Sequence, residues 1–194
     1  MRNLLIVLII VCLTISAGAG LILNGSFEAP VIANNSFTQF DEGETIDDAG
    51  EWLVISGEVD LVRQGTIHDG SQRLSLNGLN LGGKIGQEIA TVENQIYKVT
   101  YWSLDRDYAF TVGVAETSDG NYTEFENVDV TSSSDWTYKE FEFTATGAAT
   151  WVIFESNVSG DTGAGIDLVD VELVPEPATM LIFALGGLLL RRKK

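Results

Sequence analysis

The sequence predicts an all-β fold, a jelly-roll β-sandwich flanked by an N-terminal signal helix and a short C-terminal hydrophobic helix. Two observations predict the sandwich. Short runs rich in β-branched and aromatic residues alternate with clusters of Gly, Asn, Asp and Ser between residues 20 and 174, and no segment there keeps a 3.6-residue period. A third observation is an apolar run at each end of the chain. We therefore divide the chain into residues 1–19, 20–174 and 175–194.

The first 19 residues have the layout of a signal peptide. Arg2 supplies the positive charge, Leu4–Ile15 form the apolar run, and Ala17–Ala19 give a small-residue cleavage site, with the cut after Ala19. The alternative is a membrane span, but a bilayer core needs about 20 apolar residues. Signal peptidase is thus an expected partner, and its cut removes the only cysteine, Cys12. We expect a mature domain without thiol or disulfide.

Nine strands are predicted, which is a number that suits a jelly roll. They cover Leu53–Ser56, Glu58–Val62, Gln72–Leu76, Lys84–Thr91, Ile96–Leu104, Ala109–Glu116, Thr137–Ala145, Thr150–Ser156 and Ile166–Val174, with hairpin turns at 118–121 and 146–148. Alternation predicts which side chains enter the core. These are Tyr97, Val99 and Tyr101 on one strand, and Phe110, Val112 and Val114 on the next.

The C-terminal segment has three parts in a fixed order. Pro175–Pro177 (Pro-Glu-Pro) keep the chain extended, Met180–Leu190 are apolar, and residues 191–194 are basic and favour the cytoplasmic side. The alternative is an ordinary transmembrane anchor, for which this run is short. The segment resembles the PEP-CTERM sorting signal, with Pro175, Glu176 and Pro177 as its motif.

That resemblance implies a protein that is a substrate of an exosortase. It implies transient membrane insertion through the tail, cleavage near residues 175–177, and an exported protein at the cell surface or in the extracellular matrix. It also implies a setting of exopolysaccharide production and biofilm.

The domain itself is similar to galactose-binding-like jelly rolls. Leu23–Glu28 resembles the opening of carbohydrate-binding modules of the family 4, 9 and 22 type. Further segments resemble bacterial choice-of-anchor C domains and the family of unknown function numbered 642: Trp52, Ser56–Asp60, Asp69–Ser71, Leu76–Gly78, Gly86–Gln87, Ile96–Tyr97 and Ile166–Val169. Glu93–Gln95 stand where these relatives lead us to expect a glycine turn.

The same resemblance implies a structural calcium ion held by Glu28 and by Asp167. Calcium takes six to eight oxygen ligands, so backbone carbonyls and a further acid such as Asp48 would have to complete the site. The alternative is that both carboxylates are solvated or bonded to backbone amides. A single histidine, His68, excludes a histidine-rich zinc site.

Sugar binding needs flat aromatic faces and polar groups for hydroxyls. Trp102 lies on the strand face opposite the predicted core, and Trp52, Tyr108 and Tyr122 are further candidates. For Trp52, as for Trp136 and Trp151, the alternative is a place in the core.

Charge and composition exclude several functions. Residues 20–174 hold 6 basic and 27 acidic residues, a net charge of −21, which repels phosphate backbones and excludes a nucleic-acid partner. No thiol or serine nucleophile motif is present, and Asp105 and Asp107 are interpreted as a solvated loop rather than a glycosidase pair. We therefore expect no catalysis, but a module that binds extracellular polysaccharide. The alternatives are a structural or adhesive surface protein without a specific glycan and, more remotely, an extracellular glycan-active enzyme.

Overall fold

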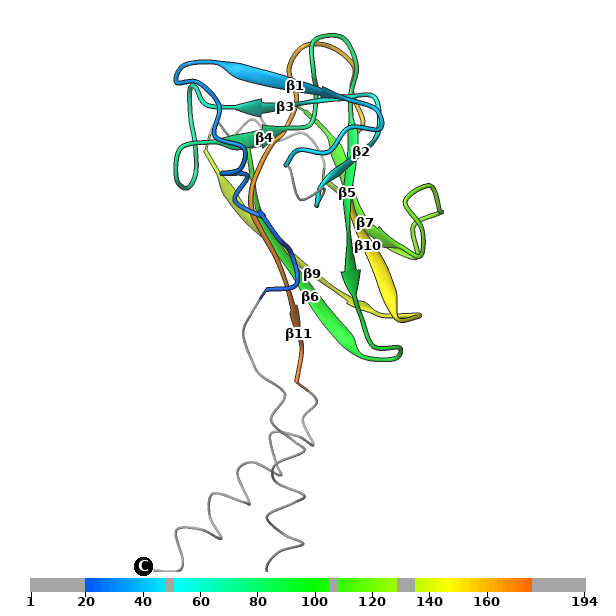
Figure 1. Cartoon of the computed structure of the whole chain (residues 1–194). Coiled ribbons are helices and arrows are strands. Elements are labelled where there is room, and N and C mark those ends of the chain that lie inside the picture. Colours follow the sequence, from blue (N-terminus) through cyan, green and yellow to red (C-terminus); the bar gives the residue numbers. More distant parts are fainter. Residues whose placement is uncertain (1–19, 48–50, 105–107, 129–134, 176–194) are drawn as a thin grey trace, which may run out of the picture.

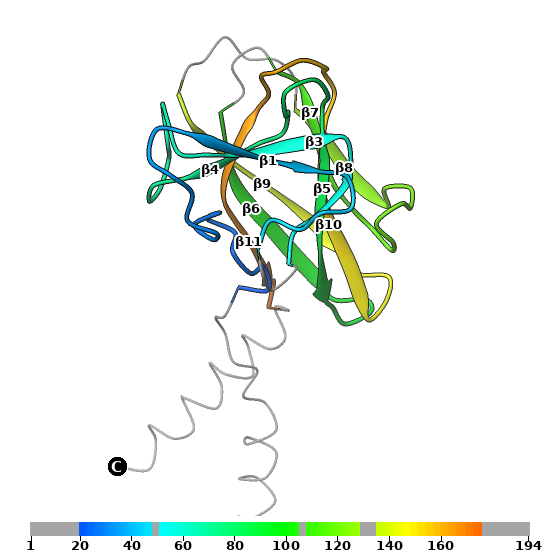
Figure 2. The ribbon, with the colours of Figure 1, turned by 45° about the horizontal axis from the view of Figure 1, so that its top comes forward.

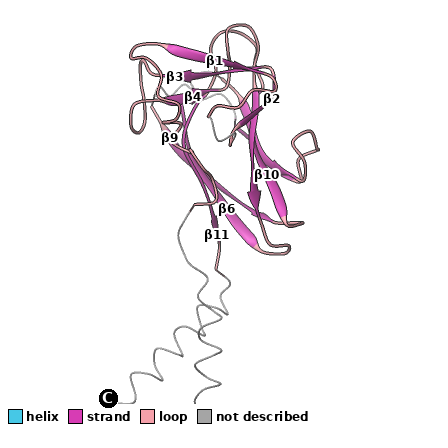
Figure 3. Ribbon diagram, in the orientation of Figure 1, coloured by secondary structure: helices cyan, strands magenta, loops and turns pink. Residues whose placement is uncertain are grey.

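The computed structural model describes residues 20–47, 51–104, 108–128 and 135–175. All regular structure in these residues is β, as Figure 3 shows. Eleven strands are described: β1 (Phe37–Asp41), β2 (Leu53–Ser56), β3 (Glu58–Val62), β4 (Arg73–Ser75), β5 (Lys84–Ala90), β6 (Ile96–Leu104), β7 (Phe110–Ala115), β8 (Glu124–Val128), β9 (Thr137–Thr144), β10 (Ala149–Ser156) and β11 (Gly165–Leu173).

The strands form two sheets packed face to face (Figures 1 and 2). Sheet A has the order β1-β3-β4-β11-β6-β9, and sheet B has the order β2-β5-β10-β7-β8. Every strand pair is antiparallel. The prediction of an all-β sandwich is thus confirmed. The predicted signal helix and C-terminal helix lie outside the described residues.

All nine predicted strands are present, with ends that differ by at most one residue. Sequence reasoning missed β1 and β8, which are edge strands of sheet A and sheet B. Their sequences, FTQFD and EFENV, are short and rich in polar residues. An edge strand has fewer neighbours to pack against, so its sequence carries a weaker apolar alternation than a central strand.

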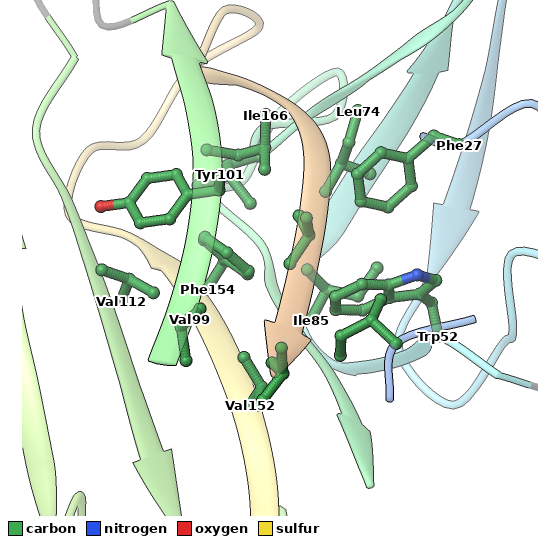
Figure 4. Close-up of a cluster of buried hydrophobic side chains, with 14 of the residues drawn as sticks. Phe27, Trp52, Leu74, Ile85, Val99, Tyr101, Val112, Val152, Phe154 and Ile166 are labelled. Atoms are coloured by element: carbon green, nitrogen blue, oxygen red, sulfur yellow. The ribbon is translucent and has the colours of Figure 1, made fainter. Parts of the chain in front are cut away.

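The core lies between the sheets and contains the residues that alternation predicted (Figure 4). Val99 and Tyr101 of β6 are fully buried, as are Phe110 and Val112 of β7. Tyr101 meets Phe154 of β10 edge-on, with ring centroids 5.2 Å apart, which joins the two sheets. Each such side chain contributes about 1.5–3 kcal/mol on burial.

The turn between β5 and β6 explains the missing glycine at Glu93–Gln95. Asn94 adopts a positive φ of 66°, the left-handed conformation that asparagine tolerates better than most residues other than glycine. Its backbone N–H donates to the carbonyl of Ala145 (2.8 Å), and the N–H of Gln95 donates to Val92 (3.1 Å). Asn94 therefore adopts the left-handed backbone conformation for which a glycine was expected.

The two ends of the domain leave from the same pole (Figure 1). The N–H of Leu21 donates to the carbonyl of Val171 (3.0 Å), so the first described residues lie beside the end of β11. No helix among the described residues has the length and hydropathy of a membrane span. From Gly165 to Leu173, β11 runs about 27 Å toward this pole.

Candidate functional site

The outer face of sheet A gathers residues from five strands. In an antiparallel ladder directly paired residues point to the same side, and here Val59, Leu61 and Leu74 point into the core. Their neighbours therefore point outward. Two rows of paired residues cross the sheet, Phe37–Val62–Arg73 and Gln39–Asp60–Ser75–Gly165–Leu104.

Beside these rows lies an aromatic cluster, which we define as His68, Trp102, Trp136 and Tyr138. Trp102 of β6 is paired with Tyr138 of β9, and their rings meet edge-on at 5.7 Å. His68, from the loop between β3 and β4, stacks on Trp102 with centroids 3.9 Å apart and planes 22° apart. The ring centroid of Trp136 lies 5.6 Å from that of His68. Tyr138 is the open member, with 46% of its surface exposed.

A groove of about 580 Å³ lies over the two rows. Asp60, Arg73 and Ser75 line it from the strands, while Phe37 and Leu79 bring apolar surface that is 50% and 58% exposed. Its remaining lining residues are Asn35, Val62, Gln64, Gly65, Thr66, Leu104, Tyr108, Asp161, Thr162 and Gly163. Apolar walls with a few polar groups are typical of ligand sites.

Asp60 is the most unusual polar residue of the groove. It is only 8% exposed, and its Oδ1 has no hydrogen-bond partner within the described part of the chain. Burial and, to a smaller extent, the Glu58 carboxylate raise the pKa of Asp60 to about 6, and Arg73 opposes the rise. A buried carboxylate without a bonded partner is costly, so its presence calls for an explanation.

Gly165 joins the groove to the aromatic cluster. A Cβ at this position would lie 3.1 Å from Arg73 Nη1, 3.2 Å from Leu104 Cβ and 3.2 Å from Trp136 Cη2. Three side chains thus converge over a residue that has none. The indole Nε1 of Trp136 is also buried and has no hydrogen-bond partner among the described residues. The groove and the cluster therefore form one continuous face.

Two of the four predicted ligand aromatics lie on this face. Trp102 points outward from sheet A as predicted, but it is half-buried and His68 covers one of its faces. Tyr108 lines the groove and donates its hydroxyl hydrogen to Thr162 Oγ1 (2.7 Å). Trp102 and Tyr108 are consequently placed on opposite sides of the Gly165 junction.

The other two predicted aromatics are elsewhere. Trp52 is 0% exposed, packs on Phe27 with ring centroids 5.3 Å apart, and donates its indole N–H to the Asn24 carbonyl. This corrects the expectation that Trp52 offers a face to a ligand, because no ligand can reach it. Tyr122 lies at sheet B, where it donates to Glu155 Oε2 (2.6 Å) below the Lys84 ammonium. It is not part of the sheet A face.

Sequence reasoning did not single out Asp60, Arg73, Trp136, Tyr138 or His68 as ligand-binding residues. A signal was available for Asp60, which is an acid between apolar residues of a predicted strand. Trp136 and Tyr138 flank the start of a predicted strand that pairs with β6. Their approach to His68 depends on how the β3–β4 loop crosses the sheet, and no local pattern states that.

Glu28 and Asp167 lie on either side of the β3–β4 loop and bind its backbone. Glu28 Oε1 accepts from the N–H groups of Ser71 (2.7 Å) and Gln72 (2.9 Å). Asp167 is fully buried, and its oxygens accept from Asp69 N–H (3.1 Å) and Leu168 N–H (2.8 Å). Burial raises the pKa of Asp167 to about 6 against these hydrogen bonds.

This donor set does not by itself fit a calcium ion. Calcium takes six to eight oxygen ligands, and three of the four carboxylate oxygens already accept backbone hydrogens. No group of three or more His, Cys, Asp or Glu side chains gathers in the described residues. The structure favours the alternative of carboxylates bonded to backbone amides. Calcium binding remains a prediction, and the suggested third acid, Asp48, lies outside the described residues.

The processing signals are described only at their border with the domain. Pro175 follows β11 and is exposed. Ala19, Glu176 and Pro177 lie outside the described residues, as do Asp105 and Asp107, the acids considered for catalysis. The N–H of Val174 donates to the carbonyl of Ile96 (2.8 Å), so the sandwich extends up to the predicted sorting motif.

Comparison with known families gives two matches that together span residues 20–194. A family model described as "Protein of unknown function (DUF642)" matches residues 20–172. The model of the PEP-CTERM protein-sorting motif matches residues 173–194. No curated protein matches the chain. The two matches meet between residues 172 and 173, two residues before the boundary predicted from the sequence.

Several solved structures share the fold. TmCBM61, solved in complex with β-1,4-galactotriose, is 17% identical with a TM-score of 0.52, covering 82% of this chain and 100% of that chain. A CBM4 structure is 16% identical with a TM-score of 0.50, covering 79% and 99%. An arabinose-bound α-L-arabinofuranosidase, MgGH51, is 15% identical with a TM-score of 0.52, covering 80% of this chain but 26% of its own. These likenesses show a two-sheet sandwich of the kind found in carbohydrate-binding modules.

Proposed function

Because the chain belongs to the DUF642 family and ends in a PEP-CTERM motif, which implies export, exosortase processing and sorting to the cell surface, we propose that it is a non-catalytic surface protein that binds polysaccharide. The binding surface is the outer face of sheet A. Its setting is the extracellular matrix, in which an exported protein meets secreted polysaccharide.

The observation that carries this proposal is the combination of groove and aromatic cluster on one face. Sugars are bound by aromatic rings that pack on their C–H groups and by polar side chains that bond their hydroxyls. Tyr138 and Trp102 supply the rings, and Asp60 with Arg73 supplies the polar groups. On the outer face of sheet B, Tyr122 and Trp151 donate hydrogen bonds to Glu155 and Glu88, and neither residue lines the groove.

The likeness to carbohydrate-binding modules supports the proposal through the fold alone. In TmCBM61 a sandwich of this kind was solved with a galactotriose bound. The arabinofuranosidase shows that the same sandwich also occurs as a small part of an enzyme chain. A sandwich that makes up most of its chain, as here, is proposed to bind rather than to react.

The test is binding of the purified protein to a panel of immobilised polysaccharides. Trp102→Ala and Tyr138→Ala are each expected to weaken binding about tenfold or more, since aromatic anchors dominate such surfaces. Trp151→Ala is the matched control, because this half-buried tryptophan lies on the outer face of sheet B. Equal loss in all three variants, or no binding to any polysaccharide, would contradict the proposal.

A second function is favoured by one observation, the net charge of −21 between residues 20 and 174. A surface this acidic suits a structural or adhesive coat whose molecules associate through cations. Analytical sedimentation of the protein with and without divalent cations measures this self-association. Self-association that depends on cations, without selectivity among polysaccharides, would favour the coat over the binding module.

A further inference from the structure

The Asp60 carboxylate is the feature of the groove that a neutral sugar explains least. Asp60 lines the groove, and only 8% of its surface is exposed. Its Oδ1 has no hydrogen-bond partner in the described chain. No ion pair of Asp60 is found within the described part of the chain, and Arg73 is the only cation that contributes to its pKa. An isolated buried charge is unfavourable unless a ligand compensates it.

The charges around Asp60 leave the groove negative. Asp60 and Asp161 line it with one cation, Arg73. Glu58 lies close enough to raise the Asp60 pKa, and the effect of Arg73 is the smallest of the three causes. The domain as a whole carries −21. A uronic acid would therefore be repelled, whereas a cationic sugar would be drawn in over some distance.

The walls of the groove favour a cationic group that is part of a larger amphipathic ligand, such as a sugar, over a free metal ion. Phe37 and Leu79 expose apolar surface on one side, and Tyr108 lines the groove as well. Its volume of about 580 Å³ is far larger than a metal ion requires. In addition, Asp60 belongs to no group of three or more His, Cys, Asp or Glu side chains that could hold a metal ion among the described residues.

We propose that this groove selects polysaccharides that carry free amino sugars, with the sugar ammonium bound by the Asp60 carboxylate. The inference rests on the proposed function and adds the ligand class to it. The ammonium supplies a positive counter-charge for the Asp60 carboxylate, and charge-assisted hydrogen bonds are about twice as strong as neutral ones. Phe37, Leu79 and Tyr108 contact the apolar faces of the ring. An N-acetylated sugar keeps the ring but loses the charge.

The test compares three ligands by calorimetry on the purified full chain. They are a β-1,4-glucosamine hexamer, the same hexamer fully N-acetylated, and a neutral glucose hexamer. The free-amine hexamer is expected to bind about tenfold more tightly than its acetylated form, as one charge-assisted hydrogen bond provides. Asp60→Asn keeps the side-chain shape and is expected to reduce this ratio to about one.

The control removes one negative charge away from the groove. Asp119→Asn makes the same chemical change in the exposed turn between β7 and β8 and is expected to keep the tenfold ratio. If Asp119→Asn lowers the ratio as much as Asp60→Asn, the preference is an effect of net charge and the inference is wrong. A thermal melt of each variant shows that it is folded.

The remaining outcomes separate the two proposals. If acetylated or neutral hexamers bind as tightly as the free amine and Asp60→Asn has no effect on the ratio, the amino-sugar inference fails while polysaccharide binding stands. If no hexamer binds and the polysaccharide panel is also negative, the proposed function fails and takes the inference with it.

Discussion

At the scale of single residues, the two buried acids of sheet A have different roles. Asp167 accepts two backbone hydrogens and holds the β3–β4 loop against the sheet, whereas Asp60 Oδ1 has no hydrogen-bond partner in the described chain. Both carboxyls have a pKa raised to about 6 by burial. A carboxylate that supports the fold and one kept ready for a ligand can thus look alike in their titration and differ only in their contacts.

Asp60 predicts a pH dependence of stability. Its pKa rises from 3.8 to about 6 on folding, so the folded protein holds the proton more tightly than the unfolded chain. The free energy of unfolding therefore falls as pH rises from about 4 to about 6 and stays lower above that range. Asp60→Asn removes this loss and is expected to be about 3 kcal/mol more stable than the wild type well above pH 6.

Urea unfolding across this pH range measures the effect. Asp119→Asn serves as the reference, because other carboxyls of this acidic domain also titrate and the exposed Asp119 removes only general repulsion. If the free energy of unfolding of Asp60→Asn equals that of Asp119→Asn at every pH, the raised pKa of Asp60 does not cause the pH dependence.

Glu28 carries a second prediction at this scale. Its Oε1 accepts two backbone hydrogens as a charged acceptor, and a glutamine amide oxygen accepts them without the charge, so Glu28→Gln is expected to lower the free energy of unfolding by about 1 kcal/mol, in chelator as well as in calcium. If calcium also binds, it raises the melting temperature of the wild type and not of Glu28→Gln. A wild-type melting temperature that calcium leaves unchanged would assign Glu28 to the loop alone.

At the scale of elements, each strand of sheet A has one face in the core and one in the site. β6 shows this most clearly, because Tyr101 packs between the sheets while its neighbour Trp102 belongs to the aromatic cluster. The period of two in the strand makes the division possible. A change on one face is therefore expected to affect either stability or binding, but not both equally.

Trp52 and Trp102 test this division. Trp52→Ala empties a fully buried position beside Phe27 and Phe154 and is expected to cost about 3–5 kcal/mol of stability. Trp102→Ala is expected to cost about 1 kcal/mol of stability and to weaken polysaccharide binding about tenfold or more. Chemical denaturation together with binding assays measures both. A loss of binding by a Trp52→Ala protein that is still folded would contradict the separation.

At the scale of the whole molecule, the site lies far from the anchoring end. The groove is lined by Leu104 at the end of β6 and lies beside Gly165 at the start of β11, whereas the chain leaves the sandwich after Leu173. β11 spans about 27 Å between these points. A domain held at a surface by its C-terminal tail therefore presents its groove away from that surface. Figure 1 shows β1, β3 and β4 at the end of the sandwich opposite the one where β11 ends.

Processing is predicted at the same scale. Protein recovered from the producing cells is expected to begin at Gly20 and to lack the residues that follow the Pro175–Pro177 motif. Intact-mass spectrometry measures both cuts and any attached group. A double variant, Pro175→Ala with Pro177→Ala, is expected to keep its tail. Recovery of wild-type protein that still ends at Lys194 would show that the sorting motif is not processed.

The sequence by itself determined the sandwich, nine of its strands, the core alternation and the sorting motif. These features are local, since a period of two, a turn residue or a run of apolar residues is visible within about ten positions. Even the turn at Asn94 follows from chemistry that asparagine shares with glycine. The edge strands β1 and β8 were not predicted, because each has few packing neighbours and its sequence therefore shows little apolar alternation.

Only the tertiary structure decided where the aromatic residues lie and which acid lacks a partner. Trp52 and Trp102 were both candidate ligand aromatics, yet one is covered by Phe27 and Phe154 and the other by His68. Asp60 and Asp167 differ in the same way, through a loop that bonds one carboxylate and leaves the other in a groove. Contacts between distant segments depend on sheet order and loop path, which no local pattern encodes.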